Sequence, residues 1–197
     1  EDVIRAAGRI LGDAMVTKRE QDLAGQFDDG TNTMGSAGAA ATLGIFAAAW
    51  ADLSGVSTAN GGPAPKPYVA VHHPFVLLDL VDVFTPTLAG GTTPLSAVGS
   101  GLAEETLRNY TVGRIFGMTV YESGNITIDG SDDAKGAVFA AGTGGGLVLV
   151  TAKEWDVSPE RDESMRATEL NVVGEYAVGE YLASWIVTLY ADASDPA

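Results

Sequence analysis

Residues 154–193 read EWDVSPERDESMRATELNVVGEYAVGEYLASWIVTLYADA, and this stretch carries the longest regular pattern in the chain. Within it, one segment places apolar or small residues at even positions and mostly polar residues at odd positions. The even positions are Leu170, Val172, Gly174 and Tyr176, and the odd ones are Glu169, Asn171 and Glu175. A period of two is typical of a β-strand with one buried face.

A second strand is predicted over residues 185–190, after a polar connection that contains glycine. Trp185, Val187 and Leu189 share one face, and Ile186, Thr188 and Tyr190 share the other. The segment is rich in β-branched and aromatic residues, as strands usually are. We expect the two strands to form a long antiparallel pair that is the cooperative core of its domain. Their polar residues form no set of nucleophile, base and orienting group, which indicates a scaffold.

Composition excludes several classes of protein. The 197 residues are 46% hydrophobic, which favours a globular chain of one domain or two small ones. A net charge of −15 with only 11 Lys and Arg residues leaves no cationic patch for direct DNA or RNA binding. The absence of cysteine excludes disulfides, thiolate metal sites and cysteine nucleophiles. No apolar run approaches the roughly 18 to 20 residues that span a bilayer.

Residues 1–27 have the periodicity of an amphipathic helix. Apolar side chains recur at a spacing of three or four residues, at Ile4, Ala7, Leu11, Ala14 and Met15. About 24 helical residues at a rise of about 1.5 Å span roughly 36 Å. We therefore expect a rod-like helix that packs on a sheet.

The middle of the chain is predicted to hold short elements joined by loops rich in glycine and proline. We expect loops over residues 30–40, 60–67 and 85–101, and a capped turn over 158–160. Helices are predicted over 41–53, 75–84 and 102–110, and strands over 68–71, 112–122 and 147–151. Gly113 and Gly117 suggest a bulge or a close backbone approach in the 112–122 strand. The long loop over 85–101 is expected to contact neighbouring molecules.

The adjacent His72 and His73 raise the question of a metal site. Neighbouring residues of a strand point to opposite faces, so the two side chains are poorly placed to bind one ion. A structural role fits better, because Pro74 is suited to the first helical position and a histidine can lie near the helix cap. We predict that no metal is bound there.

Two further stretches resemble ligand-binding loops. Residues 129–133 (DGSDD) resemble the start of a calcium loop, but Ala134 and Ala140 replace the glycine and final glutamate of an EF-hand. A weak cation site on the surface there is kept as an alternative. Residues 142–146 (GTGGG) lack the following helix of a phosphate-binding loop, because LVLVT predicts a strand. We therefore predict a flexible turn and no cofactor, metal or catalytic site.

Two glycosylation acceptor patterns occur, at Asn109 and Asn125. Such patterns are common by chance, and no secretory context is visible. We discount both.

Three stretches, in order along the chain, resemble tailed-bacteriophage major capsid proteins with the HK97-type fold. Residues 67–75 (PYVAVHHPF) are similar to a strand and His-Pro turn of the axial domain in that family, and 112–123 (VGRIFGMTVYES) to its return strand. The charged turn ERDES, then RATEL, YAVGE and the aromatic-led strand that ends in Ala-Asp-Ala, resemble the family's C-terminal end.

This resemblance implies an α+β chain with an HK97-like capsid fold. Residues 1–38 would hold a long spine helix of the peripheral domain, 39–152 a compact axial domain, and 153–197 antiparallel peripheral-domain strands that the spine helix crosses. The family also has an N-terminal arm and an extended loop, which these 197 residues lack.

The implied function is structural and not enzymatic. The chain would be a subunit of an icosahedral phage capsid that self-assembles into pentamers and hexamers around double-stranded DNA. Its partners would be copies of itself and scaffolding, portal and decoration proteins, with no membrane. The acidic composition would let packaged DNA lie inside without specific binding. The protein would be part of the virion, assembled in the host cytoplasm.

A soluble acidic binding or adhesin-like module is the alternative. The acidic surface, the glycine-rich loops and the acceptor patterns favour it. The oligomeric mass separates the two hypotheses, because a capsid protein forms shells and a binding module forms a monomer or small ring.

Overall fold

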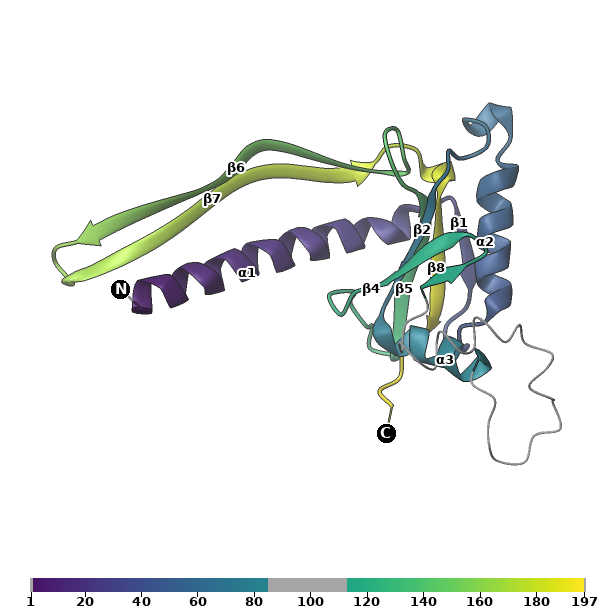
Figure 1. Cartoon of the computed structure of the whole chain (residues 1–197), viewed down its shortest axis with the longest axis horizontal. Coiled ribbons are helices and arrows are strands. Elements are labelled where there is room, and N and C mark those ends of the chain that lie inside the picture. The colour runs from purple at the N-terminus through teal and green to yellow at the C-terminus, as the bar shows by residue number, and fades with distance from the viewer. Residues whose placement is uncertain (1, 85–112, 197) are drawn as a thin grey trace.

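The computed structural model of the chain has two parts, a body built around a six-stranded sheet and an arm that projects from it (Figure 1). The structure describes residues 2–84 and 113–196. The helices are α1 (Asp2–Gly25), η1 (Gln26–Asp29), α2 (Leu43–Gly55), η2 (Thr58–Asn60), α3 (Pro74–Phe84) and η3 (Ala183–Trp185). The strands are β1 (Asn32–Gly35), β2 (Tyr68–His72), β3 (Arg114–Ile115), β4 (Met118–Glu122), β5 (Asp133–Ala140), β6 (Leu147–Asp162), β7 (Ala167–Glu180) and β8 (Ile186–Asp192). The predicted α+β class is confirmed.

The larger sheet has the strand order β1-β8-β5-β2-β4-β3. Strand β5 pairs antiparallel with both β8 and β2. Strand β1 runs parallel to β8, and β2 runs parallel to β4. The last strand of the chain therefore lies inside the sheet, between β1 and β5.

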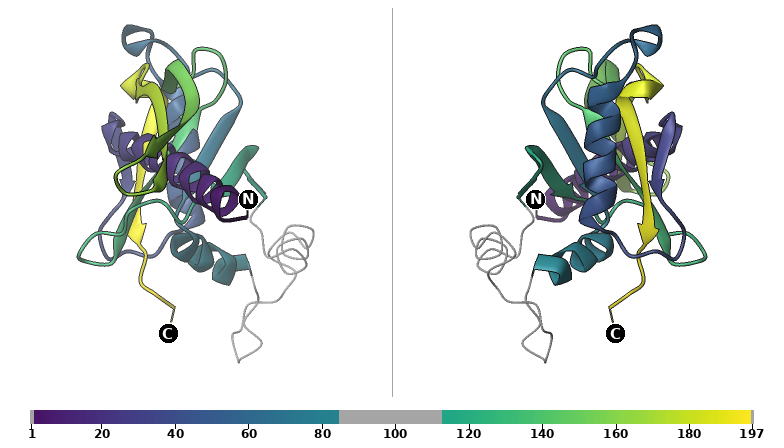
Figure 2. Two further views of the ribbon diagram at one scale, coloured as in Figure 1. Left: turned by 90° about the vertical axis from the view of Figure 1, so that its left-hand side faces the viewer. Right: turned by 90° about the vertical axis from the view of Figure 1, so that its right-hand side faces the viewer.

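Both faces of this sheet are covered around β5 and β8, so most residues of these two strands are buried. On one face, Phe27 of η1 stacks on Phe139 of β5, with ring centroids 6.0 Å apart. The Phe27 carbonyl also accepts a hydrogen bond from Thr188 Oγ1 at 2.6 Å. Helix α2 packs against β1, β5 and β8 from the opposite side (Figures 1 and 2). Residues 186–189 are accordingly all buried.

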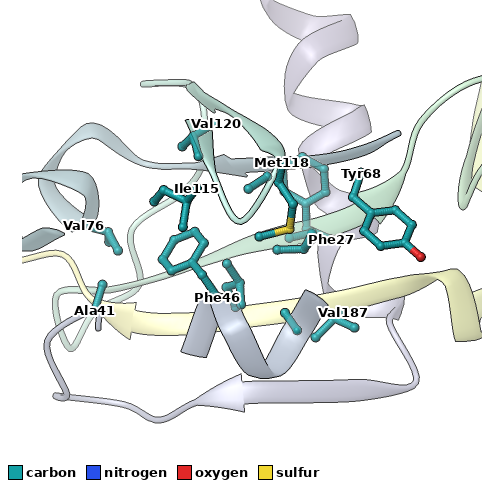
Figure 3. Close-up of a cluster of buried hydrophobic side chains, with 14 of the residues drawn as sticks. Phe27, Ala41, Phe46, Tyr68, Val76, Ile115, Met118, Val120 and Val187 are labelled. Atoms are coloured by element: carbon teal, nitrogen blue, oxygen red, sulfur yellow. The ribbon is translucent and has the colours of Figure 1, made fainter. Parts of the chain in front are cut away.

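The apolar core lies between the helices and this sheet. Phe46 and Leu53 of α2, Leu80 of α3, Met118 of β4 and Leu189 of β8 are fully buried. Figure 3 shows Phe46 and Met118 in this cluster. Burial of one such side chain stabilises the fold by roughly 1.5–3 kcal/mol. The sheet body is therefore the stable part of the chain.

The arm consists of α1 and a two-stranded hairpin, β6 and β7, which extends beside it (Figure 1). The pairing runs from Leu147 with Glu180 to Asp162 with Ala167, and residues 163–166 form the turn. Two register shifts between Thr151 and Asp156 are β-bulges in β6. In β7 the odd positions from 167 to 177 are exposed, and the even positions from 170 to 178 are half-buried. The predicted period of two is confirmed for β7, although no residue of the hairpin is fully buried.

The predicted pairing between residues 170–176 and 185–190 is wrong. Strand β7 pairs with β6, and β8 joins the six-stranded sheet. Trp185 lies in η3, and residues 186–189 do not alternate, because both of their faces are covered. A period of two identifies a strand but not its partner.

The predicted turn at 158–160 is also wrong, because these residues lie within β6. Proline is tolerated there because each strand of a two-stranded sheet has one side without a hydrogen-bonded neighbour.

Several shorter elements also differ from the prediction. The predicted loop at 30–40 contains β1, which pairs with β8 from Asn32 to Gly35. The predicted strand over 112–122 is the hairpin β3–β4, which turns at Phe116 and Gly117 with φ of 50° and 79°. Because positive φ favours glycine, Gly117 serves a turn and not a bulge. The strand predicted at 147–151 is confirmed as the start of β6.

Two predicted elements fall in the part of the chain that the structure does not describe. The loop predicted at 85–101 and the helix predicted at 102–110 lie outside the described residues. Among the helices of residues 2–84 and 113–196, none combines the length and the apolar character that a membrane span requires.

Candidate assembly surface

The arm is held together where α1 meets the hairpin. Trp155, in the bulged part of β6, lies against Gly174 of β7, where a Cβ would be 2.5 Å from Trp155 Cδ1. The Arg19 guanidinium of α1 lies 4.9 Å from the centroid of the Trp155 ring, a cation–π contact. Tyr176 Oη donates a hydrogen bond to Asp22 at 2.7 Å. Glycine at 174 therefore leaves room for the indole, and the bulges turn the indole toward the helix.

Polar contacts attach α1 to the sheet body as well. Glu20 accepts hydrogen bonds from Ser123 Oγ and Asn125 Nδ2, both at 2.6 Å. On the arm, hydrogen bonds from Lys18 and then Tyr176 hold the pKa of Asp22 below its usual value. Helix α1 thus connects the body to the hairpin.

An open groove of about 340 Å³ lies at the base of the arm. Its lining is mostly apolar and comes from α1, η1, β2, β5 and the start of β6. The polar residues in it, Glu20 and Ser123, already bond to each other. The groove therefore offers no free polar group for a cofactor.

The predicted apolar stripe of α1 is only partly confirmed. Ala7, Leu11 and Met15 are half-buried, whereas Ile4 and Ala14 are exposed. The sequence analysis missed a second apolar stripe on α1. Val3 and Ile10, which are 81% and 69% exposed, follow each other at a spacing of seven residues, and that spacing was its signal.

The hairpin exposes large apolar side chains too. Met165 in the turn is 74% exposed, and Val157 and Val173 are 54% and 49% exposed. Val157 pairs with Val172 and so lies on the opposite face of the hairpin from Val173, which means that these side chains are exposed apolar groups of the arm and not one patch.

The two histidines have the predicted structural role at the start of α3. His72 is fully buried; its Nε2 lies 3.2 Å from the Leu189 carbonyl oxygen, and its Nδ1 accepts a hydrogen bond from the His73 amide at 2.9 Å. His73 Nδ1 accepts a hydrogen bond from the Phe75 amide at 3.2 Å and so caps α3. Burial lowers the pKa of His72 to about 4, so the ring is neutral at pH 7 and donates through Nε2. No group of three potential metal ligands occurs in residues 2–84 and 113–196.

The carboxylates of residues 129–133 are already bonded within the chain. Asp129 Oδ1 accepts hydrogen bonds from the amides of Ser131 (2.8 Å) and Asp133 (3.1 Å), and its other oxygen accepts one from Tyr190 Oη (2.9 Å). These bonds lower the pKa of Asp129, and the Asp129 contact raises the pKa of Tyr190 to about 12. Asp133 Oδ1 accepts a hydrogen bond from the Gly38 amide at 2.7 Å. The weak cation site stays a prediction.

The remaining sequence candidates have structural roles where they are described. Residues 142–146 connect β5 to β6, so a strand follows them and not a helix. Asn125 donates its amide to Glu20, which occupies the group that glycosylation would modify. Asn109 lies outside the described residues.

No family model matches the chain, and no curated protein matches it. Solved structures do. A structure of Mycobacterium phage Che8 matches with a TM-score of 0.71 and 20% identity, over 93% of this chain and 62% of that chain. The capsid structure of Cyanophage P-SCSP1u matches with a TM-score of 0.64 and 11% identity, over 96% and 66% of the two chains. The holo-SrpI encapsulin complex from Synechococcus elongatus PCC 7942 matches with a TM-score of 0.66 and 13% identity, over 100% and 69%.

The chain has the HK97-type capsid fold. The long helix α1 and the multi-stranded sheet are common to it and to these shell structures, so the fold implied by the three sequence stretches is confirmed. Because the sequence identities are only 11% to 20%, the likeness shows a shared fold and nothing more. The chain spans 62% and 66% of the lengths of the two phage chains.

Proposed function

We propose that the chain is a structural subunit of an icosahedral virus capsid, a phage major capsid protein that self-assembles into pentamers and hexamers. The observation that carries this proposal is the HK97-type fold over 93% of the chain or more, in structures that include a phage capsid and an encapsulin complex. Catalysis has no part in this function.

The shape and surface of the arm support self-assembly. The arm projects from the sheet body, contains no fully buried hairpin residue, and exposes valine, isoleucine and methionine side chains. Such surfaces are stabilised when they contact further subunits, and closed symmetry lets every copy do so. Many weak contacts per subunit together hold a shell.

The proposal includes a division of labour within the chain. Helix α1 of residues 1–38 and the hairpin form a peripheral part that joins capsomers. The sheet body, which includes β1, forms an axial part that meets its copies around the capsomer axis. Strand β8 belongs to the axial part, because it pairs with β5. Scaffolding, portal and decoration proteins are further proposed partners.

Double-stranded DNA is the proposed content of the shell. With 26 Asp and Glu residues against 11 Lys and Arg, the chain repels DNA on average and holds it without specific contacts. Assembly would take place in the host cytoplasm.

Electron microscopy of the native full-length protein tests the proposal. Icosahedral shells with nucleic acid inside are expected, with absorbance at 260 nm exceeding that at 280 nm. Shells without nucleic acid would contradict the DNA-enclosing role and favour a protein compartment. A monodisperse monomer would favour the binding-module alternative.

A further inference from the structure

A turn of sequence NGG follows α2, at residues 60–62. Asn60 is the last residue of η2, and Gly61 follows it in the left-handed conformation, with φ of 98°. Both residues are exposed. This is the only place in the 197 residues where an asparagine precedes a glycine.

The side chain of Asn60 is not held by its surroundings. Its backbone N–H donates to the Ser57 carbonyl at 2.9 Å, and its carbonyl accepts a hydrogen bond from Ser184 Oγ at 2.7 Å. Its side-chain amide has no hydrogen-bond partner among residues 2–84 and 113–196. Gly61 has no side chain to screen its own backbone nitrogen, and η2 is a 3₁₀ helix of three residues, whose hydrogen bonds have poor geometry. The Gly61 nitrogen can therefore reach the side-chain carbon of Asn60.

These two groups can close a ring without an enzyme. The Gly61 nitrogen gives up its proton to water and attacks Cγ of Asn60. The new N–Cγ bond forms as the Cγ–Nδ2 bond breaks, and the amide group takes up a proton and leaves as ammonia. Water then opens the resulting succinimide at one of its two carbonyls. One opening gives aspartate on the normal backbone, and the other gives isoaspartate, in which the backbone runs through Cγ.

The same turn holds the connection between the arm and the sheet body. This connection, residues 181–185, links β7 to β8 (Figure 1). The Asn60 carbonyl accepts its hydrogen bond from Ser184, and the Gly62 carbonyl accepts one from Trp185 Nε1 at 3.0 Å. The spacing between the two carbonyls of the turn therefore helps to position the connection.

We propose that Asn60 is a site of spontaneous deamidation, and that isoaspartate at this position loosens the joint between the arm and the sheet body. Isoaspartate adds one carbon to the backbone, a bond of about 1.5 Å, and turns the Asn60 carbonyl into a carboxylate outside the main chain. The hydrogen bonds from Ser184 and Trp185 cannot both keep their lengths after such a change, because each tolerates only a few tenths of an ångström. Ordinary aspartate leaves the backbone and both bonds unchanged. This inference does not depend on the proposed function.

Two other positions lack the features that make Asn60 reactive. Asp129 also precedes a glycine, but its carboxylate accepts three hydrogen bonds, which hold it away from the next backbone nitrogen. Asn171 is exposed, but it lies within β7, and the branched side chain of Val172 screens the nitrogen that would attack. Both serve as internal comparisons.

Peptide mapping by mass spectrometry tests the site. The full-length protein is incubated at mildly alkaline pH, which removes the amide proton more often. The peptide that contains Asn60 is expected to gain the mass of an amide-to-acid change in two chromatographic forms, about tenfold faster or more than the peptide that contains Asn171. An isoaspartate methyltransferase is expected to label one of the two forms. Asn60→Gln is the matched control, because it keeps an exposed amide whose larger ring closes more slowly, and it is expected to stay unmodified.

Hydrogen exchange tests the effect on the joint. The amides of residues 181–185 are expected to exchange about tenfold faster in protein that carries isoaspartate than in fresh protein. Freshly prepared Asn60→Asp is the matched control, since it has the same added charge on a normal backbone. Its exchange is expected to equal that of the wild type, so a faster rate in the aged protein reports the altered backbone and not the charge.

The outcomes test the two parts of the inference separately. Modification of Asn60 no faster than that of Asn171 would overturn the site. Modification with unchanged exchange at residues 181–185, or with equally fast exchange in Asn60→Asp, would overturn the loosening of the joint by isoaspartate. Neither measurement depends on whether the native protein forms particles, so the proposed function stands or falls apart from them.

Discussion

At the scale of single residues, His72 joins three strands of the sheet. It lies on β2, crosses Gly136 of β5 and hydrogen-bonds the carbonyl of Leu189 on β8. A Cβ at position 136 would overlap the His72 ring and the Val71 carbonyl oxygen. The glycine is therefore required by its neighbours and not by its backbone angles.

Gly136→Ala is expected to lower the free energy of unfolding by about 1–3 kcal/mol, because the new methyl group forces the histidine and the backbone apart. Gly179→Ala in β7 is the control, since a Cβ there meets nothing within 4 Å. That control is expected to change the free energy by less than about 1 kcal/mol. Urea unfolding of both variants measures the difference, and equal stabilities would refute the steric argument.

The stability of the sheet body is expected to depend on pH through His72. Its pKa falls from the usual 6.5 to about 4 on folding, chiefly because the ring is buried. The unfolded chain therefore binds a proton that the folded chain excludes, and stability that is complete above about pH 6.5 is lost as the pH falls toward 4. Between pH 7 and pH 5, where most carboxylates remain ionised, the loss is expected to be about 2 kcal/mol.

His72→Leu is the control for this pH dependence. It is expected to be less stable at pH 7, because the Leu189 carbonyl and the His73 amide lose a partner, and to show a flatter pH profile. His73, whose pKa burial also lowers, retains part of the dependence. Urea unfolding across pH 5 to 7 is the measurement, and a wild-type profile as flat as that of the variant would contradict the assignment to His72.

At the scale of elements, β7 and β8 look alike in sequence but differ in role. Leu170 of β7 is half-buried in the hairpin, and Leu189 of β8 is fully buried in the sheet. Leu189→Asp is expected to abolish folding, because an unpaired buried charge costs several kcal/mol, comparable with the stability of a domain. Leu170→Asp is expected to fold, with a loss of about 1 kcal/mol. Circular dichroism of the two variants checks this, and an unfolded Leu170→Asp protein would make the hairpin part of the cooperative core.

The comparison of these strands also shows how much of the fold could be predicted from the sequence. Periodicity predicted the long helix and the strand around Leu170, because each has one face toward other residues and one toward solvent. It also predicted the strand over 185–190, which is β8, but not that β8 is covered on both faces. It also could not choose between β6 and β8 as the partner of β7, since pairing depends on chain reversal in space. Of the candidate assembly surface, the spacing of Val3 and Ile10 was a signal in the sequence, whereas their exposure required the structure.

At the scale of the whole molecule, stability and assembly reside in different parts. The sheet body contains the fully buried side chains, and the arm exposes apolar and charged groups. Within the arm Trp155 contacts α1, and Glu20 attaches α1 to the body. A subunit built in this way folds on its body and associates through its arm. Individual contacts between arms then need contribute only a few kcal/mol each, since every subunit makes several.

The mass of the native full-length protein at physiological salt tests the central claim most directly. Sedimentation and light scattering are expected to give one particle species of megadalton mass, as a closed shell of many copies requires. A single species at monomer or dimer mass, under every assembly condition tried, would contradict the account.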